Sequence, residues 1–180
     1  MQSRIIEQYR KKIAPALQAE FHYKNKHAIP RVTKVIVNVG VGKISKDTKM
    51  IERIQEDLAK ITGQKAALRM AKKSIAGFKS REGTPSGVMV TLRGGRMYDF
   101  IDRLISVALP RSRDFQGLPE KSFDAVGNLN IGIKEHNIFP EISYESLKDI
   151  FGLEITVVTS SKVRKEGIAL LRNMGFPIKA

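Results

Sequence analysis

The residues that most directly suggest chemistry are the cations and glycines between Arg69 and Pro85. Five cations stand in this stretch against a single carboxylate. Lysine and arginine can neutralise phosphates, glycine lets a backbone approach a ligand closely, and Phe78 offers an aromatic face to an unstacked base. The glycines and the proline interrupt regular structure, so residues 74–84 are expected to form a long exposed loop. This pattern indicates binding of a polyanion; the alternative is a solvated loop with Phe78 folded back onto the protein.

The charge of the whole chain favours the same kind of partner. Among 180 residues there are 32 lysines and arginines against 18 aspartates and glutamates, a net charge of +14. Such a balance indicates a polyanionic partner, with nucleic acid ranked before a membrane. The chain has no cysteine, which excludes disulfides, thiolate metal sites and cysteine nucleophiles. We expect a cytoplasmic protein, because no signal-peptide core or membrane-length apolar run is found.

The groups that could carry catalysis are not arranged for it. An enzyme needs a base beside a nucleophile, or two carboxylates at a suitable spacing. Asp99 and Asp102 share a predicted helix face, but Arg96 and Arg103 are near enough in sequence to pair with them. The three histidines have no carboxylate spacing that suggests a metal site. The sequence therefore predicts no enzyme activity, no metal site and no cofactor.

Five alternating segments predict the strands that must position the binding groups. Clean alternation is typical of an antiparallel sheet with one face on the core and one face open. The side chains expected to face the core are Val35, Val37, Val39, Ala66, Leu68, Met70, Val88, Val90, Leu92, Leu129, Ile131, Ile133, Leu153, Ile155 and Val157. The side chains expected on or beside the open face include Lys34, Asn38, Arg69, Thr91, Arg93, Asn130, Lys134 and Glu154. This open face is mostly cationic or neutral and polar, which suits RNA, although ordinary wet surface is the alternative.

Helical periodicity predicts the elements that cover the core side of the sheet. Helices are expected over residues 47–62, 97–109 and 162–174, and Pro15 should stop or kink a first helix that begins at Ser3. The predicted fold class is α+β. It is a single domain over residues 1–180, with a mostly antiparallel sheet of about five strands, helices packed on one face, and the other face open for RNA.

Residues 110–128 repeat the combination of cations and aromatic rings. Arg111 and Arg113 are further candidate RNA contacts, and Phe115 and Phe123 lie close to them in sequence. A segment this long without regular structure suggests a function or a partner. Residues 136–151 are less basic and would suit a protein contact or a packed surface loop.

Eight short motifs in order resemble one known family. Four of the motifs are Ala71-Lys-Lys-Ser-Ile-Ala-Gly-Phe-Lys-Ser-Arg-Glu-Gly, Val90-Thr-Leu-Arg-Gly, Arg96-Met-Tyr-Asp-Phe and Leu109-Pro-Arg-Ser-Arg-Asp-Phe. The others are Ile36-Val-Asn-Val-Gly-Val-Gly, Ile61-Thr-Gly-Gln, Gly132-Ile-Lys-Glu and Ile138-Phe-Pro-Glu-Ile. Together they resemble the bacterial large-subunit ribosomal protein family that binds 5S ribosomal RNA, over nearly the whole chain.

The resemblance implies a structural RNA-binding protein in the central protuberance of the large ribosomal subunit. Its implied partners are 5S ribosomal RNA, 23S ribosomal RNA, transfer RNA in the peptidyl site, and a small-subunit ribosomal protein across an intersubunit bridge. Together with the open face, it indicates these ribosomal RNA contacts: Lys34, Asn38, Gln64, Arg69, Thr91 and Arg93. Within the loop 72–84 it places these residues nearest to transfer RNA: Lys72, Lys73, Ser74, Gly77, Phe78, Lys79 and Arg81. Gln116 stands where family members often have an arginine, and no bridge residues can be assigned.

Two other classes of function remain open at this point. One is a general cationic RNA-binding or chaperone module without a fixed place in the ribosome, which should not prefer 5S ribosomal RNA to unrelated RNA. The other is an enzyme acting on RNA, which would require turnover that depends on one ionisable residue.

Overall fold

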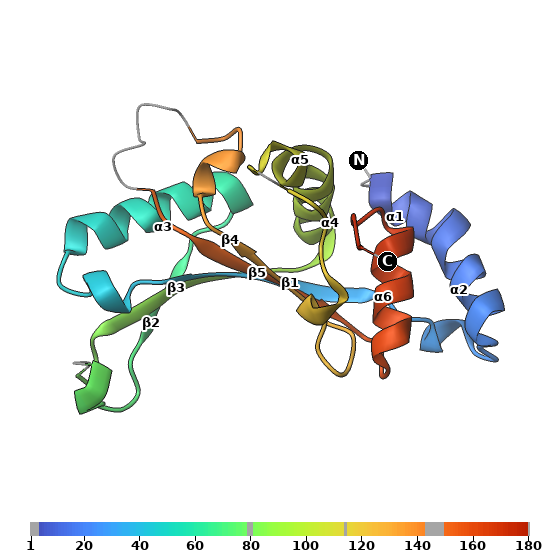
Figure 1. The fold of residues 1–180 in the computed structure, drawn as a ribbon, viewed down its shortest axis with the longest axis horizontal. Coiled ribbons are helices and arrows are strands. Elements are labelled where there is room, and N and C mark those ends of the chain that lie inside the picture. Colours follow the sequence, from blue (N-terminus) through green and yellow to red (C-terminus); the bar gives the residue numbers. More distant parts are fainter. Residues whose placement is uncertain (1–3, 79–80, 114, 143–149, 180) are drawn as a thin grey trace. The chain divides into compact units, whose positions relative to one another are not determined.

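The fold contains a five-stranded antiparallel sheet with the strand order β2-β3-β1-β5-β4 (Figure 1). The computed structural model describes residues 4–78, 81–113, 115–142 and 150–179. The strands are β1 (Val32–Gly40), β2 (Ala67–Met70), β3 (Pro85–Leu92), β4 (Leu129–Ile133) and β5 (Leu153–Thr159). Helices pack against the sheet, so the predicted α+β class is confirmed.

The helices lie close to where their periodicity predicted them. Within the described residues they are α1 (Arg4–Gln8), α2 (Ala14–Phe21), α3 (Thr48–Thr62), α4 (Gly94–Arg103), α5 (Leu109–Arg111) and α6 (Arg164–Asn173). Helix α3 has clear end signals. The Asp47 carboxylate accepts a hydrogen bond from the Met50 N–H at 3.1 Å, and Gly63 ends the helix with a φ of 68°.

Pro15 does not end the first helix, because a π-helical turn, which is wider than an α-helical turn, precedes it. Residues Tyr9–Ile13 form a π-helical turn between α1 and α2, and the Ala14 N–H bonds to the carbonyl of Tyr9, five residues earlier. Pro15 then falls in the first turn of α2, where its missing N–H is not needed. A second π-helical turn, Leu104–Ala108, precedes Pro110 in the same way between α4 and α5.

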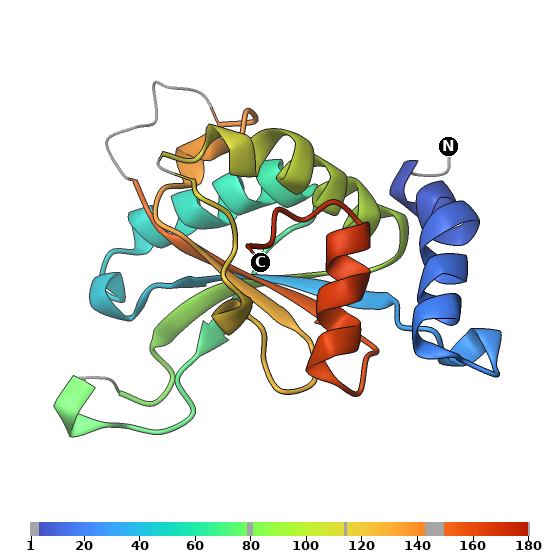
Figure 2. The same cartoon turned by 45° about the vertical axis from the view of Figure 1, so that its right-hand side comes forward.

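The chain divides into two compact units, each of which contributes strand segments to the sheet. Unit 1 comprises Met1–Val35, Leu92–Ile131 and Thr156–Ala180, and unit 2 comprises Ile36–Thr91 and Gly132–Ile155. In unit 2, helix α3 runs along one side of the strands (Figures 1 and 2). In unit 1, α1 contacts α4 and α2 contacts α6. The expected single domain over residues 1–180 stays a prediction.

The predicted core faces are confirmed on four strands; for the second strand the prediction is confirmed at Ala66, which precedes β2, and wrong at Leu68 and Met70. On β1, β3, β4 and β5, each valine, leucine and isoleucine expected to face the core is buried. On β2, by contrast, Leu68 is 36% exposed and Met70 is 51% exposed, as open as Arg69 between them. The strand has four residues, lies at the sheet edge and shifts register between Arg69 and Met70. Alternation predicts which side chains share a face of a strand, but it does not tell whether anything covers that face.

Unit 2 contains a buried histidine beside a buried carboxylate. The ring of His136 stacks on Phe151 with centroids 3.9 Å apart, and its Nδ1 accepts a hydrogen bond from the Phe151 N–H. That bond leaves the ring proton of the neutral form on Nε2, 4.0 Å from the Oδ2 of Asp57. Burial lowers the pKa of His136, Asp57 offsets part of this effect, and the positive charge of Arg53 adds to the lowering. His136 is therefore a neutral core residue rather than a ligand.

We expect His136 to make stability fall as the solution becomes acidic. Its folded-state pKa lies below the ordinary value of 6.5, so the unfolded chain takes up a proton that the folded chain resists. The free energy of unfolding should decrease as pH falls through 6.5, and it should be insensitive to this group above that value. Chemical denaturation of His136→Phe and of the parent at a series of pH values measures the difference. His27→Gln, at an exposed position, is the control and should keep the parent slope; an equally steep slope in His136→Phe would contradict this account.

Candidate nucleic-acid interface

The exposed face of unit 2 places Arg69, Gly87 and Asn38 across three neighbouring strands. Arg69 of β2 is the pairing partner of Gly87 of β3, and in an antiparallel pair such partners share one face. A Cβ built on Gly87 would lie 3.4 Å from the Oδ1 of Asn38 on β1, so Asn38 is on that same face. Gly87 itself is buried, because these neighbours close over it. The arrangement puts a guanidinium and an amide on one face of the sheet, on either side of Gly87.

Gln64 and Thr91 meet at the end of β3 in the same unit. The amide nitrogen of Gln64 donates to the carbonyl oxygen of Thr91 at 3.4 Å, which fixes the Gln64 side chain against the strand. Thr91 follows Gly87 and Met89 in the period of two, so its hydroxyl faces the same way as Asn38. Both Gln64 and Thr91 are half-buried. Asn38, Gln64 and Thr91 therefore supply neutral donors and acceptors that can read a ribose or a base edge.

Unit 1 carries the other two predicted sheet contacts. Lys34 is half-buried on β1, and Arg93 is exposed at the start of α4, where its side chain makes no capping hydrogen bond. Nearby in this unit, the Thr156 hydroxyl donates to Asn130 Oδ1 at 2.8 Å on the exposed side of β5 and β4. Unit 1 thus also presents cations and neutral hydrogen-bonding groups away from its core.

The loop 72–84 continues the β2–β3 pair and is closed at its base. The Ala71 N–H bonds to Thr84 O at 2.9 Å, and the Gly83 N–H bonds to Ala71 O at 3.0 Å. Further out, the Ser74 hydroxyl accepts a hydrogen bond from the Glu82 N–H at 2.9 Å, which holds the two sides of the loop together. The described members of the predicted transfer RNA set have exposed side chains or backbone: Lys72, Lys73, Ser74, Gly77 and Arg81. Lys79 lies outside the described residues, and Phe78 is described only through its backbone, in the short 3-10 helix Ala76–Phe78.

Several described residues between 110 and 128 pair with or pack against distant parts of the chain, which their sequence did not predict. Leu118 pairs with Ile178 near the chain's end, and Phe123 is buried next to Leu129, so Phe123 is a core residue and not an exposed ring. Arg111 and Arg113 are both exposed at the surface. The side-chain oxygen of Gln116 accepts a hydrogen bond from the Lys179 ammonium at 3.3 Å, which brings a cation next to this position.

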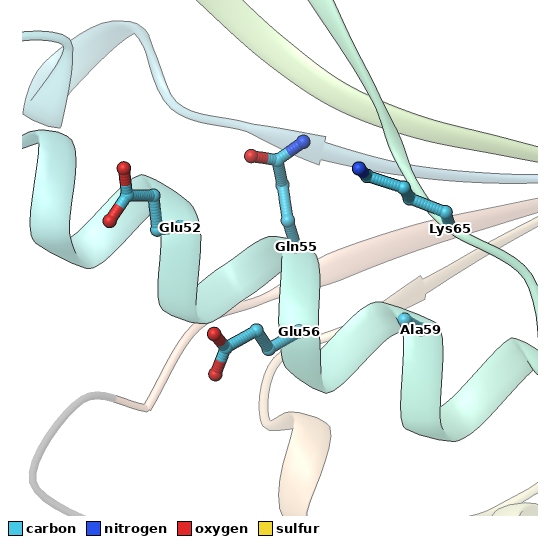
Figure 3. A pocket seen from close by; sticks show the side chains of 5 residues that line it. All are labelled: Glu52, Gln55, Glu56, Ala59 and Lys65. Carbon is cyan, nitrogen blue, oxygen red and sulfur yellow. The ribbon is translucent and has the colours of Figure 1, made fainter.

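A shallow hollow on unit 2 does not suit a phosphate. It lies beside α3 and is lined by Glu52, Gln55, Glu56, Ala59 and Lys65 (Figure 3). Glu52 and Glu56 of α3 are exposed here, and the single ammonium of Lys65 does not outweigh their two carboxylates. Within the described ranges, no group of three or more His, Asp or Glu side chains could hold a metal ion. No helix in the same part of the chain is long and apolar enough to cross a membrane.

The sequence reasoning missed Gly87 as part of this surface. As a glycine it has no side chain to count in an alternating pattern, and its position within a strand was the only available signal. A glycine inside a strand often marks a close approach of another group, and here that group is the side chain of Asn38.

Comparison with known proteins gives one consistent result. The model for the C-terminus of the ribosomal L5 family matches residues 85–178, and the model for ribosomal protein L5 matches residues 25–81. The chain is 51% identical to the large ribosomal subunit protein uL5 of Halothermothrix orenii, over 96% of this chain and 97% of the relative. It is 54% identical to uL5 of Acaryochloris marina, over 92% and 91% of the two chains. It is also 50% identical to uL5 of a Synechocystis strain over the full length of both.

Substitutions on the open face should separate RNA binding from folding. Asn38→Ala and Thr91→Ala remove half-exposed polar groups, so the free energy of unfolding should change by less than about 0.5 kcal/mol. Their affinity for RNA should fall by about 1–3 kcal/mol if the group is buried against the ligand. Val90→Ala, on the opposite face of β3 from Thr91, is the matched control. It should lower the free energy of unfolding by about 1–3 kcal/mol and leave the RNA affinity of the folded protein unchanged. Thermal unfolding and filter binding with 5S ribosomal RNA measure both quantities, and unfolding of Thr91→Ala would contradict the assignment of strand faces.

Proposed function

Because this chain belongs to the family of ribosomal protein L5, we propose that it binds 5S ribosomal RNA and helps to attach it in the central protuberance of the large ribosomal subunit. Family membership makes the chain a structural protein of that subunit and not an enzyme. The site proposed for 5S ribosomal RNA is the open face of the sheet.

The observation that carries this proposal is the row formed by Arg69, Gly87 and Asn38 on three adjacent strands. Phosphate contacts from a guanidinium position an RNA, and amides and hydroxyls can then bond to its riboses and base edges. Because these groups stand on strands rather than on a flexible loop, their backbone loses little conformational freedom on binding.

The loop 72–84 is proposed to contact transfer RNA in the peptidyl site. The exposed cations Lys72, Lys73 and Arg81 lie beyond a base that is closed by the Ala71–Thr84 hydrogen bonds. Such a projecting basic loop can reach a second RNA while the sheet face is occupied. We also propose 23S ribosomal RNA and a small-subunit protein as partners, as the family resemblance implies.

Salt dependence tests the electrostatic part of the proposal. If cations meet phosphates, the logarithm of the binding constant for 5S ribosomal RNA should fall linearly with the logarithm of the salt concentration. Arg69→Gln should reduce the slope of this plot by about 0.7–0.9, which is what one phosphate contact contributes to the slope. Lys43→Gln, in the exposed turn Gly42–Ile44, should leave the slope unchanged. A binding constant that is flat between low and physiological salt would overturn the electrostatic account.

Exchange of the loop tip tests the transfer RNA contact. Replacing residues 75–81 with a Gly/Ser linker of equal length keeps the Ala71–Thr84 and Ser74–Glu82 hydrogen bonds that close the loop. Folding and binding of 5S ribosomal RNA should therefore be nearly unchanged, because exposed loops contribute little to stability. Transfer RNA should leave the peptidyl site of ribosomes carrying this variant faster than it leaves the parent ribosomes.

A second loop variant separates charge from shape. The substitutions Lys72→Gln, Lys73→Gln and Arg81→Gln remove three exposed cations and keep the loop backbone. If phosphate contacts hold the transfer RNA, this variant should reproduce most of the increase in off-rate. An unchanged off-rate of transfer RNA in the linker variant would favour a solvated loop. Loss of 5S ribosomal RNA binding in the linker variant would show that the loop belongs to the sheet site.

A further inference from the structure

Gln64 is held from two sides, and one of the residues that hold it is buried. Its side chain bonds to the carbonyl oxygen of Thr91, and its backbone N–H lies 3.4 Å from the hydroxyl oxygen of Thr62. Thr62 is the last residue of α3 and is only 2% exposed. Both residues belong to the motif Ile61-Thr-Gly-Gln, in which Gln64 alone is a predicted RNA contact. The structure therefore raises the question of what the buried hydroxyl does for its neighbour.

The hydroxyl of Thr62 is oriented by helix α3. It donates to the carbonyl oxygen of Leu58 at 2.6 Å, and the carbonyl oxygen of Gln64 lies 3.1 Å away. The single proton of a hydroxyl serves one acceptor at a time, and the Leu58 oxygen is the closer one. The lone pairs of the same hydroxyl are then left to accept the Gln64 N–H. Because Leu58 is completely buried, the core of the helix determines where that N–H lies.

Gly63 allows the chain to return to the Thr62 hydroxyl. Its φ of 68° is in the left-handed region that favours glycine, and its N–H bonds to the carbonyl oxygen of Ala59 at 2.8 Å. The turn ends α3 within one residue, so the next N–H, that of Gln64, faces the side chain of Thr62 and not a helical carbonyl.

The chain that follows Gln64 is also fixed to α3. The side-chain amide of Gln55 donates to the carbonyl oxygen of Ala66 at 3.0 Å. Figure 3 shows Gln55 reaching from the helix toward the segment that carries Lys65. The side chain of Ala66 is itself buried. Gln64 thus lies between two points of the backbone that are both attached to one helix, which limits how far it can shift.

A fixed Gln64 amide offers a ligand a defined pair of hydrogen-bonding groups. Its nitrogen carries two protons, and one of them is donated to the Thr91 carbonyl oxygen. The other proton and the amide oxygen are not used by that bond, and the side chain is half-buried rather than enclosed. A glutamine amide can bond to a base edge that carries a matching acceptor and donor. Such recognition requires that the plane of the amide is held in place.

We propose that Thr62 is a positioning residue for 5S ribosomal RNA: its hydroxyl holds Gln64 so that the amide presents one donor and one acceptor to a single base edge. This inference rests on the proposed function and adds to it a source of selectivity, whereas Arg69 supplies charge that any RNA can use. The motif then divides its work among four residues. Ile61 anchors the end of α3 in the core, Thr62 fixes the next N–H, Gly63 turns the chain, and Gln64 binds the base.

Substitutions at position 62 test the proposal. Thr62→Val keeps the shape of the side chain and removes the hydroxyl, Thr62→Ala removes it without a branched side chain, and Thr62→Ser keeps it. Thr48→Val, at an exposed position of the same helix, is the control. Filter binding measures the affinity of each protein for 5S ribosomal RNA and for an unrelated RNA of equal length, over the same series of salt concentrations. Thermal unfolding identifies a temperature at which every variant is folded, and binding is measured there.

Loss of the hydroxyl should weaken selective binding alone. Thr62→Val and Thr62→Ala should bind 5S ribosomal RNA about three- to tenfold more weakly than the parent, the effect of one misplaced neutral hydrogen-bonding group. Their affinity for the unrelated RNA and their salt slope should equal those of the parent, because no cation is removed. Thr62→Ser and the control should bind both RNAs within about twofold of the parent.

A double-mutant cycle shows whether Thr62 acts through Gln64. In the Gln64→Ala background, Thr62→Val should change the affinity for 5S ribosomal RNA by less than about twofold, because no amide is left to position. In the Asn38→Ala background it should keep its full effect, because Asn38 lies on another strand and makes its own contact.

Three outcomes would overturn the inference. Equal losses in the parent, Gln64→Ala and Asn38→Ala backgrounds would mean that Thr62 serves the fold and not the site. Unchanged affinity for 5S ribosomal RNA without the hydroxyl would mean that Gln64 needs no such support, and equal weakening for both RNAs would remove the role in selectivity. Failure of the proposed function is separate: in that case the parent itself would bind 5S ribosomal RNA no better than unrelated RNA.

Discussion

The burial of one side of each central strand is the constraint on which the rest of this structure depends. Val35, Val37 and Val39 on β1, like Val88, Val90 and Leu92 on β3, are almost completely removed from water. Burial of apolar surface contributes about 25 cal/mol per Å², and a one-residue slip in register would expose each of these side chains. The same burial fixes the opposite side of each strand. Asn38 and Thr91 lie on the open side because the valines beside them cannot be turned outward.

Much of the fold could be predicted from the sequence because most of its elements carry complete local signals. Helix α3 has a cap at Asp47, an apolar stripe and a terminal glycine, and its observed bounds differ little from the predicted ones. The errors arose where the decisive contact is distant in sequence. Leu68 and Met70 alternate correctly, yet nothing covers the edge strand that carries them. Phe123 is buried because of its neighbours in the fold, which no local pattern reveals.

The candidate site could be predicted residue by residue, but not as an arrangement. The motifs indicated Asn38, Gln64 and Thr91, and the alternation of the second strand indicated Arg69. The strand order and register were needed to show that Arg69 and Asn38 flank Gly87, and that Gln64 bonds to the strand end at Thr91.

The exposed edge strand also has a consequence for the free protein before it joins a ribosome. An unpaired strand edge is a template onto which another chain can add a strand and so begin aggregation. β2 limits this risk in three ways: it has four residues, its register shifts before Met70, and Arg69 places a charge in its middle. Two chains approaching edge to edge would repel each other through Arg69 and the neighbouring Lys65 and Lys72. The positive charge that we propose to bind RNA therefore also opposes pairing of two free copies at this edge.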